Sequence, residues 1–236
     1  MIIRDFIQGV TDKLRGRDDI VDRIPNYIRS AILDLSQNYE FEELRVKGPL
    51  TNFIVNQSSY PKKGSNCIFI NPGDDAITFI VTWFVYYSTT VTIGQSTGME
   101  IKARTPRVVE PTSMISGIPT YYTIIGNEIL VGYLPNQAYA TQMRYQRQHP
   151  FSLGTQLINS TVFMPDDWKE IIEYAAAEKG CDDIGMNDIG ILYHQKIYGN
   201  PQKKVPGIIA ERQSQQQRNL TYNETQLRPV VKRYTR

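Results

Sequence analysis

The chain has 236 residues, enough for one large domain or two small ones with a substantial core. Its 26 Lys and Arg residues nearly balance its 24 Asp and Glu residues, and the net charge of +2 argues against a non-specific nucleic-acid coat or a polybasic membrane binder. A hydrophobic content of 41% with 21% charged residues is typical of a folded globular chain and not of a disordered one.

Cysteine and histidine are scarce, which limits the chemistry available to the chain. Cys67 and Cys181 have no nearby Cys or His in the sequence, so we expect free thiols, no metal site and no cofactor. A nucleophilic triad would have to use His149, expected in a loop, or His194, expected on a helix surface. The N-terminus lacks the pattern of a signal peptide, and no apolar stretch approaches the ~20 residues that span a bilayer. We therefore expect synthesis in the cytoplasm and no membrane partner.

Residues 1–47 show helical periodicity. Gly16 separates two apolar stripes with spacings of three or four, and Gly48-Pro49 is expected to end the helical region. Asp18 or Asp19 is expected to cap the segment that follows Gly16, and Pro25 suits the first turn of the second helix. The two stripes are Ile3, Phe6, Val10 and Leu14, then Ile24, Ile28, Ala31, Ile32 and Leu35.

Residues 49–150 show the pattern of β-structure. In the strongest strand signal, one face carries Ile77, Phe79, Val81, Trp83, Val85 and Tyr87, and the other carries Ile80, Phe84 and Tyr86. Gly126-Asn127 predicts a two-residue hairpin loop between strands at Tyr121–Ile125 and Glu128–Tyr133. Further short runs lie at Val91–Ile93 and Gln142–Arg147. Repeated short strands separated by turns indicate a small sandwich or barrel.

Residues 162–218 return to a helical pattern. The first helix follows Pro165, with Asp167 and Glu170 at the spacing of a capping box. The second is expected to start at a capping Asn187 or Asp188 and to end at Gly199-Asn200-Pro201. The expected apolar positions are Trp168, Ile171, Ile172, Ala175 and Ala176 in the first helix, and Ile191, Leu192, Tyr193 and Ile197 in the second.

The C-terminal segment 219–236 differs from the rest. Residues 200–236 contain eight Lys and Arg against two Glu, whereas the remaining residues contain 18 basic and 22 acidic side chains. This basic tail is either a solvated terminus or an arm that orders on a partner. The arm is favoured by its apolar and aromatic side chains, and its candidate docking residues are Tyr222, Arg228, Val230, Val231, Lys232, Arg233, Tyr234 and Arg236.

These patterns predict an α+β fold. N- and C-terminal helices are expected to form a helical bundle, with a central antiparallel β domain inserted and an extended C-terminal arm. The expected segments are 1–48 and 151–218 for the helical body, 49–150 for the β domain and 219–236 for the arm.

Several short motifs resemble catalytic ones but have simpler interpretations. Gly73-Asp74-Asp75 matches the tripeptide of polymerases, which need a further carboxylate and a far larger fold, so we interpret it as a turn. Asp182-Asp183 and Asp188 are interpreted as helix-end residues, not cation ligands. Glu170 and Glu173 are interpreted as solvated, not as a glycosidase pair. We expect no catalytic residue and no enzyme activity.

Aromatic residues at the end of the strongest strand form a candidate β-domain interface. Trp83, Phe84, Tyr86 and Tyr87 would suit a platform on which sugars stack, although core packing accounts more simply for at least half of them.

The order of several motifs resembles that of head-to-tail adaptor (head-completion) proteins of short-tailed bacteriophages. The run from Gly117 to Pro135 resembles a hairpin of that family, with Tyr, Gly and Pro at the family's positions. Met143-Arg-Tyr-Gln-Arg resembles the tyrosine-bearing strand that follows this hairpin. Phe163-Met-Pro-Asp-Asp-Trp168 matches a helix start, and Tyr174-Ala-Ala-Ala-Glu178 an Ala-rich helix. Val131 and Tyr133 depart from the pattern. The resemblance covers roughly residues 1–50 and 115–220, and residues 55–110 form a larger β insertion than the family leads us to expect.

The resemblance implies a structural virion protein at the head–tail junction. Such an adaptor assembles as a ring of its own copies, expected to be a dodecamer, docks beneath the portal protein and connects to the next tail component, such as a nozzle or tail tube. The C-terminal arm would grip the portal, and genomic DNA would pass through the lumen without sequence-specific binding.

Two alternatives from other classes stay open. In the first, the β region with its Tyr and Trp faces is a carbohydrate- or host-surface-binding module of a phage tail. A hydrolase using Glu170 or Glu173 would need a cleft, to which the sequence does not point.

Overall fold

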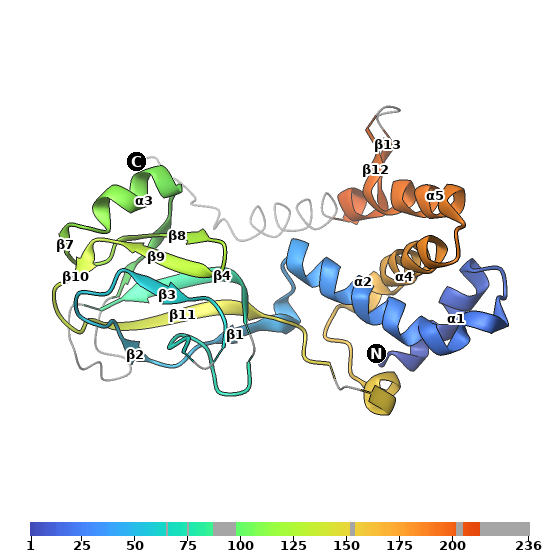
Figure 1. Ribbon diagram of the computed structural model, residues 1–236, viewed down its shortest axis with the longest axis horizontal. Helices are drawn as coiled ribbons and strands as arrows, with labels where there is room; N and C mark the ends of the chain where they lie inside the picture. Colours follow the sequence, from blue (N-terminus) through green and yellow to red (C-terminus); the bar gives the residue numbers. More distant parts are fainter. Residues whose placement is uncertain (65, 75, 87–97, 152–153, 202–204, 213–236) are drawn as a thin grey trace, which may run out of the picture. The chain divides into compact units, whose positions relative to one another are not determined.

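The computed structural model describes residues 1–212 except 65, 75, 87–97, 152–153 and 202–204. Its helices and sheets give an α+β fold, as the sequence predicts, and they divide into two units (Figure 1). The helical unit holds the described residues of Met1–Ile32, Leu153–Thr161 and Asp166–Arg236. The β unit holds the described residues of Leu33–Ser152 and Val162–Pro165.

The helical unit contains short 3₁₀ segments, a two-stranded hairpin and helices that bury the predicted stripes. Its elements are α1 (Arg4–Lys13), η1 (Asp18–Arg23), α2 (Ile24–Asn38), which continues into the β unit, η3 (Gly154–Asn159), η4 (Asp166–Trp168), α4 (Lys169–Asp183), α5 (Asn187–Tyr198), β12 (Gly199–Asn200) and β13 (Val205–Pro206).

The apolar stripes of α1, α2 and α4 are confirmed. Helix α1 packs on α4, and α4 packs on α5. Gly16 follows α1 with a positive φ of 65°, a conformation that glycine adopts at low cost where a helix ends. The predicted stripe residues that are buried include Ile3, Phe6, Val10 and Leu14, Ile24, Ile28, Ala31 and Ile32, and Trp168, Ile171, Ile172, Ala175 and Ala176.

The predicted helix caps are wrong. The N-cap positions of α4 and α5 are Trp168 and Met186, and neither makes a side-chain capping hydrogen bond. Asp167 instead pairs with Arg212 at 2.9 Å. Asp19 pairs with Arg17 at 2.5 Å and does not cap η1, whose N-cap is Arg17. Asp167 and Asp19 therefore form ion pairs with arginines, and other residues occupy the N-cap positions.

The β unit consists of short strands joined by tight turns, with one short helix. Its elements are η2 (Glu42–Leu44), β1 (Arg45–Lys47), β2 (Thr51–Asn52), β3 (Ser59–Pro61), β4 (Ile77–Val85), β5 (Met99–Glu100), β6 (Lys102–Ala103), α3 (Pro106–Thr112), β7 (Ser116–Gly117), β8 (Tyr121–Ile125), β9 (Glu128–Gly132), β10 (Leu134–Pro135) and β11 (Ala140–Arg147). Strand β1 lies within the region predicted to be helical, so that prediction is wrong at its C-terminal end.

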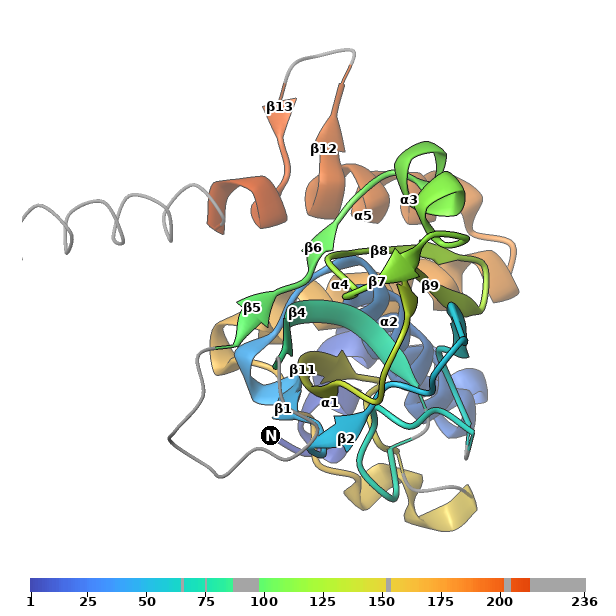
Figure 2. The same ribbon diagram turned by 90° about the vertical axis from the view of Figure 1, so that its left-hand side faces the viewer.

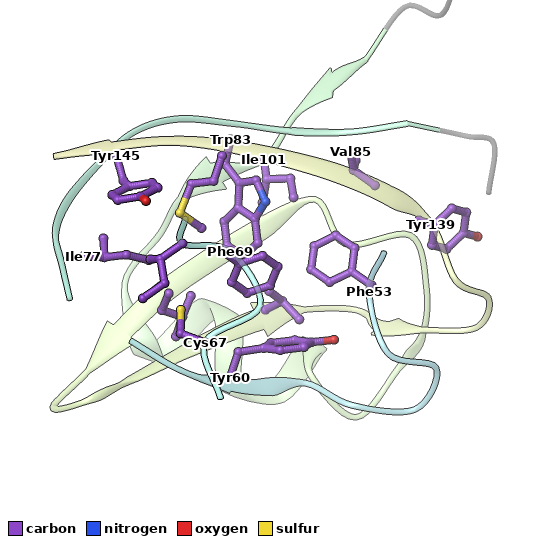
Figure 3. Close-up of a cluster of buried hydrophobic side chains, with 14 residues drawn as sticks. Phe53, Tyr60, Cys67, Phe69, Ile77, Trp83, Val85, Ile101, Tyr139 and Tyr145 are labelled. Carbon is purple, nitrogen blue, oxygen red and sulfur yellow. The ribbon is translucent and has the colours of Figure 1, made fainter. Parts of the chain in front are cut away.

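The strands form two main sheets that face each other across one core. The first has the order β1-β11-β4-β5, with β2 also paired to β11, and the second has the order β3-β9-β8-β6. Strand β4 curves across the first sheet (Figure 2). Trp83 from the first sheet and Tyr60 from the second converge with Phe53 and Phe69 between them (Figure 3). Because the strands form two separate sheets that share one core, this unit is a small sandwich, one of the two predicted alternatives.

The strict alternation predicted for β4 is wrong. Its pairing with β11 shifts register at Arg144/Tyr145 and again at Gln146/Arg147. Each irregularity changes which side chain faces the core, so Ile80 packs against the core cluster while Ile77, Trp83 and Val85 are buried in it.

The predicted turns of the β unit are confirmed. Ile125 pairs with Glu128 across the Gly126-Asn127 loop, and Gly126 has a φ of 59°. At Pro72-Gly73, the amide of Asp74 donates to the carbonyl of Asn71 at 3.1 Å, and Gly73 has a φ of 97°.

A buried glutamine connects the end of α2 to β11. The side chain of Gln146 is 0% exposed, and its Nε2 donates to the carbonyls of Ser36 at 2.8 Å and Tyr39 at 2.9 Å. Its Oε1 accepts the Phe41 amide hydrogen at 2.6 Å. The second half of α2 thus belongs to the β unit. The boundary between the units lies at Ile32/Leu33, inside α2, whereas the sequence pattern places it at residue 48.

Replacing Gln146 with Leu should destabilise the β unit by about 3 kcal/mol, because backbone groups at the end of α2 lose their partners in a buried site. The control Gln142→Leu removes one hydrogen bond, to the Gly48 carbonyl at 3.1 Å, from a half-buried site and should cost about 1 kcal/mol. Urea unfolding of both variants measures the difference. Equal losses would show that the Gln146 contacts contribute no more than the single bond of Gln142.

Candidate interaction surface

The four aromatic residues of the predicted β-domain interface do not share one exposed face. Trp83 is 0% exposed, and its indole Nε1 donates to Thr141 Oγ1 at 2.7 Å. Phe84 and Tyr86 lie on the other face of β4 and its extension and are half-buried. Tyr87 lies outside the described residues. The burial of Trp83 assigns the largest ring of the set to the core.

Glu173 is part of a buried ion pair in the helical unit. Its Oε2 lies 2.7 Å from Lys13 Nζ, and both side chains are largely buried, at 12% and 17% exposed. Gly9 leaves room for this carboxylate, since a Cβ at position 9 would lie 2.3 Å from Glu173 Oε1. Glu170 lies instead 3.7 Å from Lys196. The two glutamates therefore have separate cationic partners, and the arrangement does not pair them for glycoside cleavage.

The other acidic motif residues also have structural contacts. Asp183 pairs with Arg23 at 2.9 Å and accepts a hydrogen bond from the Tyr27 hydroxyl, and both contacts hold its pKa below the usual value. Asp74, in the predicted turn, accepts the Tyr145 hydroxyl at 2.5 Å. Asp75 lies outside the described residues. Among the described residues, no group of three or more His, Cys, Asp or Glu side chains is placed to hold a metal ion.

His149 lies in a loop, as predicted, but it is buried at 3% exposed. Its Nε2 accepts the Phe163 amide hydrogen at 2.9 Å, and its ring stacks on Phe151 with centroids 4.1 Å apart. Burial, with a smaller contribution from the charge of Arg147, lowers the pKa of His149 to about 4. The imidazole is therefore neutral near pH 7 and connects two loop segments of the β unit.

The predicted stripe of α5 is only partly confirmed, and its failure identifies an exposed surface. Ile197 is buried, whereas Ile191 and Leu192 are 54% and 62% exposed. Tyr198, at the end of α5, and Val205, on β13, are also exposed. We call these four residues the α5 surface. The signal was present in the sequence, because three successive apolar residues, Ile191 to Tyr193, cannot all face one side of a helix.

A groove of about 570 Å³ adjoins the α5 surface. Residues of α4 and α5 and of the chain that follows α5 line it, among them Glu178, Asp182, Ile191, His194 and Tyr198. His194 lies on the helix surface, as predicted, with Nδ1 2.8 Å from Glu178 Oε1. The groove thus combines apolar walls with two carboxylates.

A second exposed apolar surface lies in the β unit. Val108 on α3 and the following Met114 and Ile115 are 45%, 86% and 53% exposed. We call these residues the α3 surface. Sequence reasoning did not identify it, because Pro106 and Pro111 obscure the helical pattern of this short segment.

The predicted docking arm, residues 219–236, lies outside the described residues. Cys67 and Cys181 are free thiols, as predicted, and both are buried. In the described part of the chain, no helix is both long enough and apolar enough to cross a membrane.

No protein-family model and no curated protein matches this chain.

Replacing Gly9 with Ala should destabilise the helical unit by about 2 kcal/mol, because the new methyl group displaces Glu173 from Lys13. A helix-interior glycine with space around it would instead gain stability on substitution by alanine. Gly190→Ala is the matched control and should lose less stability, because its Cβ would lie 3.3 Å from Asp182 Oδ1, a tight contact that a small shift of that side chain relieves. Thermal unfolding of both variants measures the effect, and equal stability of Gly9→Ala and wild type would contradict the buried pair.

His149 should make the β unit less stable in acid. The pKa of about 4 in the folded state lies below the usual value of about 6.5, so the unfolded chain takes up the proton first as the pH falls. The contribution of neutral His149 to the free energy of unfolding is fully present above about pH 6.5 and decreases toward pH 4, by up to about 3 kcal/mol. In His149→Gln this part of the pH dependence should disappear. Parallel stability curves for wild type and variant, measured by urea unfolding over that range, would refute the assignment.

Proposed function

We propose that the protein is a head-to-tail adaptor of a short-tailed bacteriophage: a structural protein that forms a ring of its own copies beneath the portal and extends the DNA channel toward the tail. The observation that carries this proposal is the pair of exposed apolar surfaces, the α5 surface and the α3 surface. Large exposed apolar side chains that cluster mark sites of protein association.

A closed ring needs two different contact surfaces on each subunit. In a rotationally symmetric ring, one surface of a subunit contacts a different surface of its neighbour. The α5 surface belongs to the helical unit and the α3 surface to the β unit. The chain therefore offers two distinct apolar surfaces, as heterologous contacts require.

The charge distribution fits a conduit better than a DNA-binding protein. Residues 1–199 carry 18 basic and 22 acidic side chains, so their net charge is −4. A body of this charge has little net attraction for phosphates, which lets DNA pass without being held. The basic residues concentrated in the C-terminal segment would then serve to dock the portal, with Tyr222, Val230, Val231 and Tyr234 as apolar anchors.

The alternative function, a carbohydrate- or host-surface-binding β module, has weaker support. Stacking on a sugar requires an exposed ring face, and Trp83 is fully buried. Phe84 and Tyr86 are the described residues of that set that keep partial exposure.

Deleting residues 219–236 should abolish assembly onto portal rings and leave the folded chain intact. The segment would supply the portal contacts, whereas the buried cores lie within residues 1–212. Co-sedimentation with purified portal rings measures binding, and circular dichroism checks the fold. The matched control replaces the segment with a Gly/Ser sequence of equal length. Binding of the deleted chain at the wild-type level would overturn the role of the arm.

A further inference from the structure

The groove beside the α5 surface has the chemistry to bind a peptide that is both basic and apolar. Glu178 and Asp182 place two carboxylates in its lining, and Ile191 and Tyr198 supply apolar area. His194 Nδ1 lies 2.8 Å from Glu178 Oε1, and the described residues that line the groove include these two carboxylates but no Lys or Arg. A cationic side chain entering the groove would therefore meet net negative charge.

The chain itself contains a segment of the complementary chemistry. The stretch Arg228–Tyr234 combines basic and apolar residues: Arg228, Pro229, Val230, Val231, Lys232, Arg233 and Tyr234. It carries three positive charges and no carboxylate. A groove of about 570 Å³ is large enough for several side chains of this stretch, but not for the whole tail.

The tail begins within reach of the groove. Arg212 pairs with Asp167 at 2.9 Å, which places the last described residues beside the start of α4. Glu178 and Asp182 lie about 17–22 Å further along this helix, at 1.5 Å per residue. Residues 213–227, when extended, span about 50 Å. Because the segment is tethered, its effective concentration at the groove is in the millimolar range, which favours its own groove over that of another copy.

We propose that, in the free chain, the segment Arg228–Tyr234 binds the groove between α4 and α5 of the same molecule. Its basic side chains pair with Glu178 and Asp182, and its valines and tyrosine cover Ile191 and Tyr198. The segment thereby shields part of the α5 surface until a partner binds the tail. This inference concerns the isolated chain and holds or fails independently of the proposed adaptor ring.

The test uses the full chain with a nitroxide spin label on Arg236→Cys and isotope-labelled isoleucine methyl groups. Cys67 and Cys181 are buried, so the label should attach to the introduced cysteine. We expect the Ile191 methyl signal to lose most of its intensity and to recover in E178Q/D182N. The matched control E43Q/E110Q removes the same number of charges from exposed positions of the β unit and should keep the loss.

A mixing experiment separates binding within one molecule from binding between molecules. Spin-labelled chains without isotope are combined with isotope-labelled chains without a spin label. Unchanged Ile191 intensity in this mixture supports the intramolecular contact, whereas a loss there would overturn it in favour of exchange between copies. Full Ile191 intensity in the doubly labelled chain would overturn the proposal altogether.

Discussion

Helix α2 ends inside the β unit, where backbone groups in its last turn and just beyond it need partners. Gln146 of β11 supplies them, donating to Ser36 and Tyr39 and accepting from Phe41. Because β11 also pairs with β1, β2 and β4, this one side chain ties the helix end to the central strand of the larger sheet. A buried polar group with three satisfied bonds permits few alternative arrangements, so it determines how the chain passes from helix to sheet.

The sequence was informative where periodicity alone determines structure. The stripe from Ile3 to Leu14 and the hairpin at Gly126-Asn127 follow from spacing and turn chemistry, and both are confirmed. Local patterns failed where a distant partner decides. The irregular pairing of β4 with β11 is invisible in β4 itself, and the carboxylate of Asp167 pairs with Arg212, 45 residues away in the sequence.

The candidate site shows the same limits. Trp83 lies on the opposite face of the strand from Phe84 and Tyr86 because side chains alternate along a strand, and its indole also donates to Thr141 of another strand. Glu173, a candidate for chemistry by residue type, pairs with Lys13, and the absence of a side chain at Gly9 leaves room for its carboxylate. Ile191 and Leu192 were named from the sequence as apolar positions of the helix, but periodicity in one chain cannot distinguish an internal core from a surface that awaits a partner.

The proposed function rests on two properties that are separated along the chain. The described residues form a mildly acidic body with exposed apolar surfaces, and the C-terminal segment carries basic and apolar residues suited to docking. An adaptor needs such a division, because its body must contact identical neighbours while its arm contacts a different protein. The proposed contact of the tail with its own groove would keep these two associations in order, since a covered α5 surface is not available to a neighbouring copy.

The most direct test of this account is the native mass of the full chain, measured alone and with portal rings. The account predicts a monomer in isolation and a complete ring of copies on each portal. A chain that stays monomeric in the presence of portal rings, or that binds them as isolated single copies, would contradict it.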